Sequence, residues 1–421
     1  MSQTGATCDT SAEVRDFYDR YPHPPPVDNL EQYRQLWQDQ HRRRADHHLF
    51  WPASRYKEDQ SILIAGCGTS QAAKHALRWS AARITAIDCS ETSVRRTDEL
   101  KQKYNLQNLE VHQLAIEQVN GLGMRFDQIV CTGVLHHLAD PDAGLSALRG
   151  VLNPDGAMHL MVYAPYGRTG IYMLQEFCRR IGIRANDGDI RDLIGALRAL
   201  PPGHPLETVL SQAPDFRHEA ALADALLHPQ DRAYSVPQLF EFIEKAGLTF
   251  GRWARQAPYS LQCGVIAEIP QVTRMAGLSP VEQYAAVELF RGTMARHSVV
   301  VYRNDGASSL QPISFAGDAW VDYVPIRMSD TICVQDRLPP GAAAVLINQT
   351  HTYRDLFMPI GPSEKRLFDS IDAESSIGEI VERTLLFSHR TTNLKMARAF
   401  FERLWWYDQA VFDASRRPTA D

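Results

Sequence analysis

Between Ser61 and Tyr163, short apolar segments alternate with longer segments of helical periodicity, and this alternation constrains the fold more than any other feature. The apolar segments cover 61–65, 83–87, 109–114, 126–131 and 158–163, and helices are expected over 71–80, 91–104 and 141–152. Strands joined through helices pair in parallel, because the crossover needs a dozen or more residues. The pattern therefore predicts an α/β fold with a doubly wound, mostly parallel sheet.

The rest of the chain predicts two further regions, and 421 residues suffice for two or three domains of about 150 residues. Residues 1–60 are expected to form a helical N-terminal cap, interrupted by prolines at 21–26 and continuing as one helix over about 30–48. The sheet domain is expected over 61–269, with a helical insertion at about 170–233, and strands within 253–269 are expected to close the sheet. Residues 270–421 are expected to form a second, mixed α+β domain, with a helix over 281–296, a strand over 298–302 and a helical end over 397–413.

Charge and cysteine usage exclude several classes of partner. A formal net charge of −6 provides no global field that would attract nucleic acid. The seven cysteines are scattered without zinc-ligand spacing, so no metal site is expected. The first residues lack the features of a signal peptide, and no segment approaches the roughly 18 apolar residues of a membrane span. We therefore expect a cytoplasmic protein with no membrane association, whose oligomeric state the sequence leaves open.

A glycine-containing turn follows the first strand. Gly66 and Gly68 would let a ligand approach the backbone closely, and the next helix would present free amides to it. Asp88 ends the next strand, about 20 residues further on, where a carboxylate can accept hydrogen bonds from ribose hydroxyls. A dinucleotide-binding loop would carry its third glycine where this chain has Gln71, which disfavours an NAD-linked oxidoreductase.

Four segments together resemble a known family. ILIAGCGTS, AIDCSETSV, FDQIVCTGVLHHLADP and LNPDGAMHLMVY occur in this order and resemble the motifs of class I S-adenosylmethionine-dependent methyltransferases. The resemblance implies a Rossmann-like fold and S-adenosylmethionine as cofactor. It departs from the family at Ile64, where an acidic residue is common, and at Ala115, where Asp is common. Because of these departures, the sequence does not identify which groups accept hydrogen bonds from the methionine ammonium and the adenine amine. Glu117 is one candidate acceptor.

The resemblance also implies which residues bind the cofactor. The glycine loop would lie against the methionine and ribose, Asp88 would hold the ribose, residues after the third strand would flank the adenine, and those after the fourth strand would line the sulfonium end. Tyr18 and Tyr21 belong to the segment Tyr18-Asp19-Arg20-Tyr21-Pro22, which resembles a segment that covers the cofactor in some family members. A proline-rich arm packed on the surface would explain the segment equally well. The residues assigned to the cofactor are Tyr18, Tyr21, Gly66, Cys67, Gly68, Asp88, Cys89, Ala115, Ile116, Glu117, Thr132 and His137, with Gly133 beside them.

The catalytic assignment stays open. Methyl transfer from a sulfonium depends mainly on positioning, and a general base is needed only if the acceptor must lose a proton. His137 and Tyr163 are the candidates, with His136 as an alternative base. Tyr166 and Arg168 follow Tyr163 after the fifth strand and would complete a second wall of the acceptor site. Arg168 could bind a carboxylate or phosphate of the acceptor, although an arginine at such a position more often lies on the surface.

The leading hypothesis is an enzyme that methylates a small molecule or a peptide or protein. The alternatives are a regulatory or scaffold protein that binds S-adenosylmethionine without catalysis and, less favoured, the NAD-dependent oxidoreductase. The C-terminal region is expected to be an accessory domain for docking a substrate or partner. Its segment 364–383 reads as helix, turn, helix and slightly resembles winged-helix or peptide-chaperone modules.

Overall fold

The computed structural model describes residues 6–207, 218–306, 312–384 and 390–416, which form two compact units. Within these limits, the first unit contains the segments 1–36, 58–250 and 288–305. The second contains 37–57, 251–287 and 306–421. Each unit is therefore assembled from segments that are distant in the sequence.

The first unit is built on a seven-stranded sheet with the order β3-β2-β1-β4-β5-β7-β6. Strands β1 to β5 pair in parallel, and β7 runs antiparallel to β5. β1 is buried along its whole length, as expected for the central strand of a sheet covered on both faces. The strands are β1 (Ser61–Ala65), β2 (Arg83–Asp88), β3 (Leu109–Gln113), β4 (Phe126–Thr132), β5 (Leu152–Tyr163), β6 (Leu248–Trp253) and β7 (Arg296–Arg303).

The helices between these strands begin where the sequence offers caps. Ser90 accepts a hydrogen bond from the amide of Ser93 at the start of α5, and Asp140 does the same for Ala143 at the start of α6. The helices of this part are α1 (Ala6–Arg20), α2 (Glu31–Leu36), α4 (Gln71–Arg78), α5 (Glu91–Lys103), α6 (Pro141–Val151) and α11 (Val236–Lys245), with 3₁₀ turns η1 (Ile116–Leu122), η2 (Leu135–His137) and η3 (Tyr166–Arg168).

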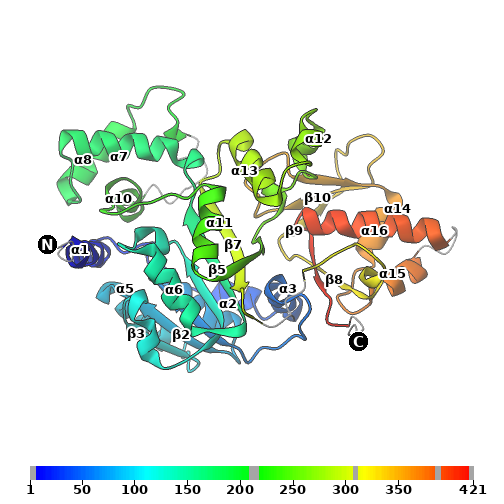
Figure 1. The fold of residues 1–421 in the computed structure, drawn as a ribbon, viewed down its shortest axis with the longest axis horizontal. Helices are drawn as coiled ribbons and strands as arrows, with labels where there is room; N and C mark the ends of the chain where they lie inside the picture. The colour runs from blue at the N-terminus through cyan, green and yellow to red at the C-terminus, as the bar shows by residue number, and fades with distance from the viewer. Residues whose placement is uncertain (1–5, 208–217, 307–311, 385–389, 417–421) are drawn as a thin grey trace. The chain divides into compact units, whose positions relative to one another are not determined.

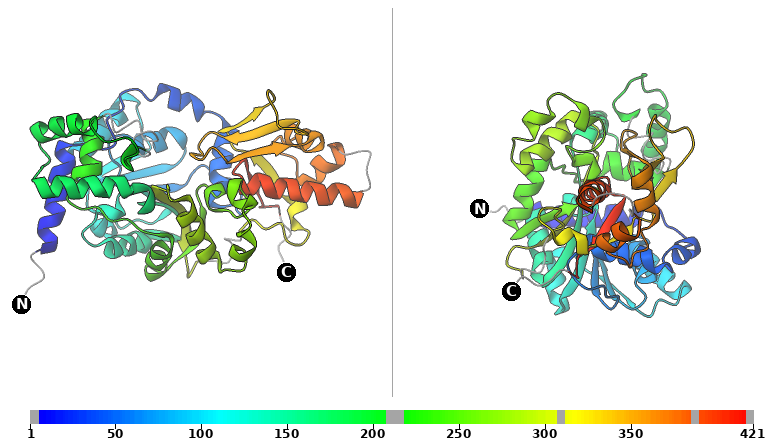
Figure 2. Two further views of the ribbon diagram at one scale, coloured as in Figure 1. Left: turned by 90° about the horizontal axis from the view of Figure 1, so that it is seen from above. Right: turned by 90° about the vertical axis from the view of Figure 1, so that its right-hand side faces the viewer.

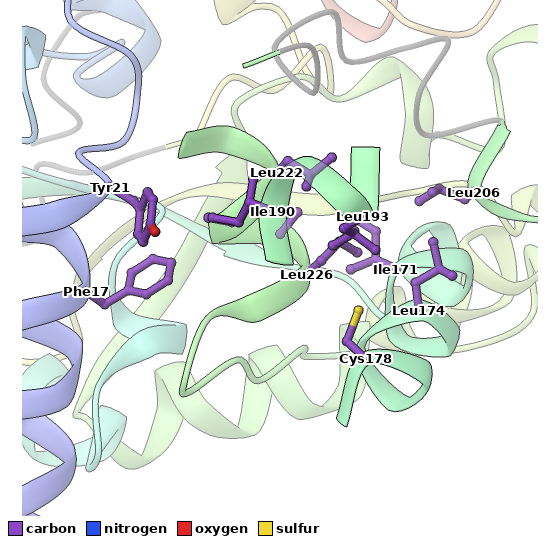
Figure 3. Packing of buried hydrophobic residues seen from close by; sticks show 12 residues of the cluster. Phe17, Tyr21, Ile171, Leu174, Cys178, Ile190, Leu193, Leu206, Leu222 and Leu226 are labelled. Atoms are coloured by element: carbon purple, nitrogen blue, oxygen red, sulfur yellow. The ribbon is translucent and has the colours of Figure 1, made fainter. Parts of the chain in front are cut away.

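The insertion after β5 forms its own small core together with α1. It contains α7 (Thr169–Ile181), α8 (Asp187–Leu197) and α10 (Glu219–Leu227), which gather together in Figure 1. Phe17 and Tyr21, from the N-terminal segment, reach the apolar side chains of these helices, among them Ile190 and Leu222 (Figure 3). The insertion is thereby held against the chain's N-terminal segment.

The second unit carries two small antiparallel sheets, with the orders β11-β10-β9 and β12-β8. Its longest described helix, α16, contacts α14, α15 and β12 (Figure 2). The elements are α3 (Gln40–Phe50), η5 (Ala257–Tyr259), η6 (Gly264–Glu268), α12 (Val272–Met275), α13 (Pro280–Arg291, shared with the first unit), η7 (Ala319–Asp322), β8 (Val324–Arg327), β9 (Thr331–Val334), β10 (Ala344–Asn348), β11 (Phe357–Ile360), α14 (Pro362–Asp369), α15 (Ile377–Thr384), α16 (Arg390–Trp406) and β12 (Ala410–Asp413).

The fold class is confirmed: a Rossmann-like, mostly parallel sheet with a helical insertion, and a mixed α+β remainder. In the described part of the chain, no helix is both long and apolar enough to cross a bilayer.

Several element predictions were wrong. The strand expected in the C-terminal domain is β7, which completes the main sheet because its buried Val299, Val300 and Val301 pair with β5. Trp253 ends β6, and the rest of the segment 253–269 contains the short 3₁₀ turns η5 and η6 instead of further strands that close the sheet. The single helix expected over 30–48 is divided into α2 and α3, and residues 410–413 form β12 rather than the end of a helix. The boundary expected at 270 also differs, because 37–57 and 251–287 join the second unit.

Candidate functional site

A cavity of about 520 Å³ opens in the first unit at the carboxyl ends of the parallel strands, where folds of this class bind ligands. Most of the residues singled out in the sequence lie in its wall. They are Tyr18, Gly66, Gly68, Asp88, Cys89, Ala115, Ile116, Glu117, Thr132, Gly133, His137 and Tyr163.

The turn after β1 depends on its glycines. Gly66 and Gly68 have φ angles of +74° and +53°, in the left-handed region that other residues rarely adopt. A Cβ at Gly66 would overlap the side chain of Val134, and one at Gly68 would lie 3.2 Å from the carbonyl oxygen of His23. The amides of Gly66 and Cys67 both donate to the carbonyl of Ile87, which ties the turn to the end of β2.

The carboxylate of Asp88 connects the two strand ends. Oδ2 accepts a hydrogen bond of 2.9 Å from the amide of Gly68, and Oδ1 accepts one of 2.9 Å from the amide of Ser90. Burial raises the pKa of Asp88, and these two amide bonds oppose the rise. Each oxygen accepts one of these two bonds and keeps capacity for another donor from a ligand.

The N-terminal segment lies against this turn. The carbonyl of Pro24 accepts a hydrogen bond from the hydroxyl of Thr69, and Asp19 accepts bonds from the hydroxyl of Ser90 and the amide of Thr92. His23 and Pro24 thereby become part of the pocket wall. The segment thus lines the pocket, and its role in covering a cofactor stays a prediction.

Two of the residues assigned to the cofactor lie outside the pocket. The side chain of Cys67 is fully buried, and its sulfur lies 3.6 Å from the hydroxyl of Thr97. Tyr21 instead packs into the core of the insertion, and its hydroxyl donates to Asp187. Cys67 therefore contributes only backbone to the turn, whereas Tyr21 anchors α1 to α8.

A second cluster lies beside the pocket at the end of β5. Asp224, on α10, accepts hydrogen bonds from the hydroxyl of Tyr18 at 3.0 Å and from that of Tyr163 at 3.3 Å. Burial, followed by the charge of Asp224, raises the pKa of both tyrosines well above the ordinary value. Both hydroxyls therefore stay protonated and serve as hydrogen-bond donors at neutral pH.

His137 and His228 complete this cluster. Their side-chain nitrogens and the Asp224 carboxylate come within 4.8 Å of one another. The Nδ1 atom of His137 lies 2.7 Å from the carbonyl oxygen of Gln230, so Nδ1 carries the proton and Nε2 offers a lone pair. The amide of Gln230 donates to Nδ1 of His228, which leaves the proton of that neutral ring on Nε2.

The geometry of the two rings decides what the cluster can do. The rings of His137 and His228 stack, with centroids 3.9 Å apart and planes tilted by 36°. Burial lowers the pKa of His228 to about 3, with His137 as a further cause, so the His228 ring is neutral. A metal site would need lone pairs from both rings converging on one point. The two rings instead present one lone pair, on Nε2 of His137, beside the Asp224 carboxylate, and this arrangement suits proton transfer.

Tyr163 is held rigidly between two other side chains. The ring of His136 lies on it at a centroid distance of 3.9 Å, and the guanidinium carbon of Arg168 lies 3.5 Å from its centroid. Arg168 forms a buried ion pair of 3.0 Å with Asp231. Arg168 is thus committed to internal contacts and lies outside the pocket wall, as does Tyr166, which is 40% exposed.

Comparisons with known proteins agree with this geometry. Residues 63–158 match the model of a family described as a methyltransferase domain. Residues 63–158 thus form a methyltransferase domain. Over 94% of the chain, the fold resembles 78% of PKMT2 from Rickettsia typhi in complex with AdoHcy, with a TM-score of 0.63 and 13% sequence identity.

Two curated relatives match parts of the chain. An uncharacterized protein of Synechococcus sp. is 37% identical over 198 residues, or 45% of this chain and 47% of the relative. The tRNA U34 carboxymethyltransferase of Campylobacter curvus is 26% identical over 103 residues, or 24% of this chain and 34% of the relative. The chain thus spans less than half the length of either curated relative.

Several residues of the pocket wall and of the cluster beside it were missed in the sequence. Asp224 and His228 stand in the helical insertion, far from any motif, and only the packing of α10 brings them to the end of β5. Lys74 and Arg78 recur on α4 at the spacing of one helix face, a signal that the sequence contained. His23 and Pro24 belong to the proline-rich segment, whose path the sequence did not specify.

Proposed function

We propose that the chain is an S-adenosylmethionine-dependent methyltransferase that acts on a small molecule or a peptide or protein. The observation that carries this proposal is the position of Asp88, in the same pocket wall as the glycine turn and hydrogen-bonded to its Gly68 amide. A ribose needs an acceptor of this kind beside a turn that the ligand can approach closely. The methyltransferase fold of the unit supports the same assignment.

The residues present fit this cofactor. Asp88 would accept from the ribose hydroxyls, Ala115, Ile116 and Glu117 would flank the adenine, and the glycine turn would face the methionine. A cavity of about 520 Å³ is within the range of small-molecule sites, roughly 300–1,000 Å³. Bound S-adenosylmethionine would supply a methyl group on a sulfonium, an electrophile with a good leaving group.

His137 then serves as the proton acceptor of the reaction. Its Nε2 lone pair is set by the Nδ1 bond to Gln230, and the carboxylate of Asp224 stabilises the imidazolium that forms. Tyr18 and Tyr163 place hydroxyl donors in the pocket wall beside it. This cluster favours an enzyme over a protein that binds the cofactor only for regulation, because binding alone does not need a positioned base.

The first experiment is calorimetric titration of the full chain with S-adenosylmethionine, S-adenosylhomocysteine and NAD. We expect binding of the first two and none of NAD. Failure of both adenosyl ligands to bind would overturn the proposal.

The second experiment is transfer of a labelled methyl group into a cell extract by the wild type and by His137→Gln. Removal of a general base lowers the rate by about 100- to 10,000-fold. The affinity for S-adenosylhomocysteine should remain close to that of the wild type. Cofactor binding without any transfer by the wild type would instead support the regulatory alternative.

A further inference from the structure

Three side chains of the pocket wall, from α1, η2 and β5, offer a ligand hydrogen-bond acceptors and no donors. Tyr18 and Tyr163 line the pocket, and each donates its single hydroxyl proton to Asp224. His137 also lines the pocket, and the carbonyl oxygen of Gln230 binds its Nδ1 proton. The groups left for a ligand are therefore the Nε2 lone pair of His137 and the lone pairs of the two hydroxyl oxygens.

The Nε2 atom of His137 is shielded from bulk solvent, and no residue in the described part of the chain forms a hydrogen bond with it. A buried acceptor without a donor is unfavourable, so a ligand that brings a donor to this atom would be stabilised. A ring nitrogen of His137 also lies within 4.8 Å of the Asp224 carboxylate. A ligand group that bonds to His137 therefore lies close to the charge of Asp224.

Asp224 adds a negative charge beside these acceptors. Its side chain is buried, and within the described residues it forms two hydrogen bonds from neutral hydroxyls but no ion pair. Burial acts to raise the pKa of Asp224, but the neighbouring histidines and the hydrogen bond from Tyr18 lower it below its ordinary value. The carboxylate is therefore ionised at neutral pH, and a cation brought by a ligand would compensate a buried charge.

Two arginines of this region leave the charge of Asp224 uncompensated. Arg168 packs on the ring of Tyr163 but forms its ion pair with Asp231. Arg296 stands opposite Tyr163 in the sheet and lines the pocket, but it is exposed, so water and salt screen its charge. The buried carboxylate is screened much less, and it therefore dominates the electrostatics at short range.

The hydrogen-bond acceptors and the buried charge together select one class of ligand. Asp224 would repel a carboxylate, a phosphate or a phenolate, whereas a neutral hydroxyl group would bring a single donor and no charge. An ammonium brings three N–H donors and a positive charge. Building on the function proposed above, we propose that the methyl acceptor is an amine, which binds as an ammonium against His137 and beside Asp224.

The same residues then prepare the amine for methylation. His137 takes one proton from the bound ammonium onto Nε2, and Asp224 stabilises the imidazolium that forms. The amine nitrogen thereby gains the lone pair that a nucleophile needs. It forms a bond to the methyl carbon as the carbon–sulfur bond breaks and its electron pair stays on sulfur. The products are an N-methylammonium and S-adenosylhomocysteine, and the imidazolium returns its proton to water.

The ammonium site can be tested without knowing the methyl acceptor, with n-butylammonium as the probe and n-butanol as its uncharged counterpart. Ligand-observed NMR measures the binding of each to the full chain, alone and saturated with S-adenosylhomocysteine, at constant ionic strength and with a chelator present. The test variant is Asp224→Asn, which keeps the shape of the side chain. Its control, Glu219→Gln, removes one negative charge from an exposed position of the same helix, α10. Thermal melting verifies that both variants fold.

We expect the wild type to bind n-butylammonium more tightly than n-butanol. The Asp224→Asn variant should bind n-butylammonium at least about tenfold more weakly, as for the loss of a charged hydrogen bond, and Glu219→Gln should bind it like the wild type. A wild type without preference for the ammonium, or equal weakening in both variants, would overturn the proposal.

A parallel calorimetric titration of the same variants distinguishes the methyl acceptor from the cofactor's own positive charge. It compares S-adenosylmethionine with S-adenosylhomocysteine, which lacks the sulfonium. If Asp224→Asn weakens only the binding of S-adenosylmethionine and leaves that of n-butylammonium unchanged, the carboxylate serves the sulfonium, and the amine assignment is wrong.

The chemical class of the methylated product gives a second test. Labelled methyl transfer into a cell extract is followed by acid hydrolysis and cation-exchange chromatography at low pH. N-methyl amines survive hydrolysis and are retained as cations, and we expect the label there. Label in methanol or in an uncharged compound would overturn the amine assignment and leave the methyltransferase function supported. Absence of binding by both adenosyl ligands, with the preference for n-butylammonium retained, would contradict the proposed function and leave the ammonium site supported.

Discussion

The carboxylate of Asp88 and the backbone amide of Gly68 are joined by a hydrogen bond of 2.9 Å across the ends of β1 and β2. This bond aims the carboxylate and fixes the glycine turn at once. Asp88→Asn keeps the shape of the side chain but removes its charge, and it places an NH₂ group where an acceptor is needed. A hydrogen bond to a charged group contributes about 1.5–3 kcal/mol. We therefore expect S-adenosylhomocysteine to bind about 10- to 100-fold more weakly in calorimetric titration.

The matched control for this variant is Asp59→Asn, which makes the same change at an exposed position just before β1. It should bind S-adenosylhomocysteine like the wild type. Equal affinities of Asp88→Asn and the wild type would show that the carboxylate does not contact the ligand.

Gly66 gives a test of the turn itself. Gly66→Ala meets two costs: the left-handed φ of +74°, worth about 1–2 kcal/mol for a residue with a Cβ, and overlap with Val134. Chemical denaturation should show a loss of at least about 2 kcal/mol, since overpacking adds to the backbone strain. Adding Val134→Ala should remove the overlap, so the double variant should lose less stability than the sum of the two single variants. Strictly additive losses would mean that the turn relaxes away from Val134.

The glycine turn and Asp88 were predictable because both are local features. Each lies directly after an apolar strand, and the carboxyl ends of parallel strands meet at one edge of the sheet. The same logic placed Thr132 at the end of β4 and His137 after it. The pocket wall contains all of these residues. Cys67 and Tyr21 show the limit of such reasoning, since a position in a motif does not specify which way a side chain points.

The parts of the fold and of the site that were not predicted depend on contacts between segments that are distant in the sequence. The buried Val299-Val300-Val301 segment reads as a strand in any context, and only its pairing with β5 assigns it to the main sheet. Asp224 reaches Tyr18 and Tyr163 across 206 and 61 residues of sequence. No periodicity encodes such distances. The acceptor half of the site is made largely of these long-range contacts, which explains why it stayed open.

Removing one partner of the ion pair between Arg168 and Asp231 should destabilise the protein strongly, because the two side chains are only 6% and 3% exposed. Arg168→Met leaves a buried carboxylate without its cation, which costs about 3–5 kcal/mol in the free energy of unfolding. Asp231→Asn added to it should restore part of that loss, since the uncompensated charge disappears. In contrast, Arg20→Met breaks an exposed pair with Asp187 and should cost less than about 1 kcal/mol. Similar losses in Arg168→Met and Arg20→Met would contradict the proposed difference between the two pairs.

His75 should make the folded state sensitive to mild acid. The side chain lies on α4 and is buried, and its Nδ1 lies 3.0 Å from the carbonyl of Gln71. Burial, followed by the charge of Arg78, lowers the pKa of His75 to about 3 in the folded chain, against 6.5 for an ordinary histidine. The unfolded chain therefore binds the extra proton between these two values, and stability falls as the pH drops below 6.5.

The size of this effect follows from the pKa difference. At pH 5 the linkage amounts to about 2 kcal/mol for this one side chain, and none of it is present at pH 7. His75→Gln cannot titrate, so the stability gap between wild type and variant should shift by that amount, in the variant's favour, between pH 7 and pH 5. His41→Gln, at a side chain that is 62% exposed, should show no such shift. Urea unfolding of the three proteins at both pH values measures the gap, and a pH-independent gap for His75→Gln would mean that the His75 imidazole takes up its proton equally in the folded and the unfolded chain.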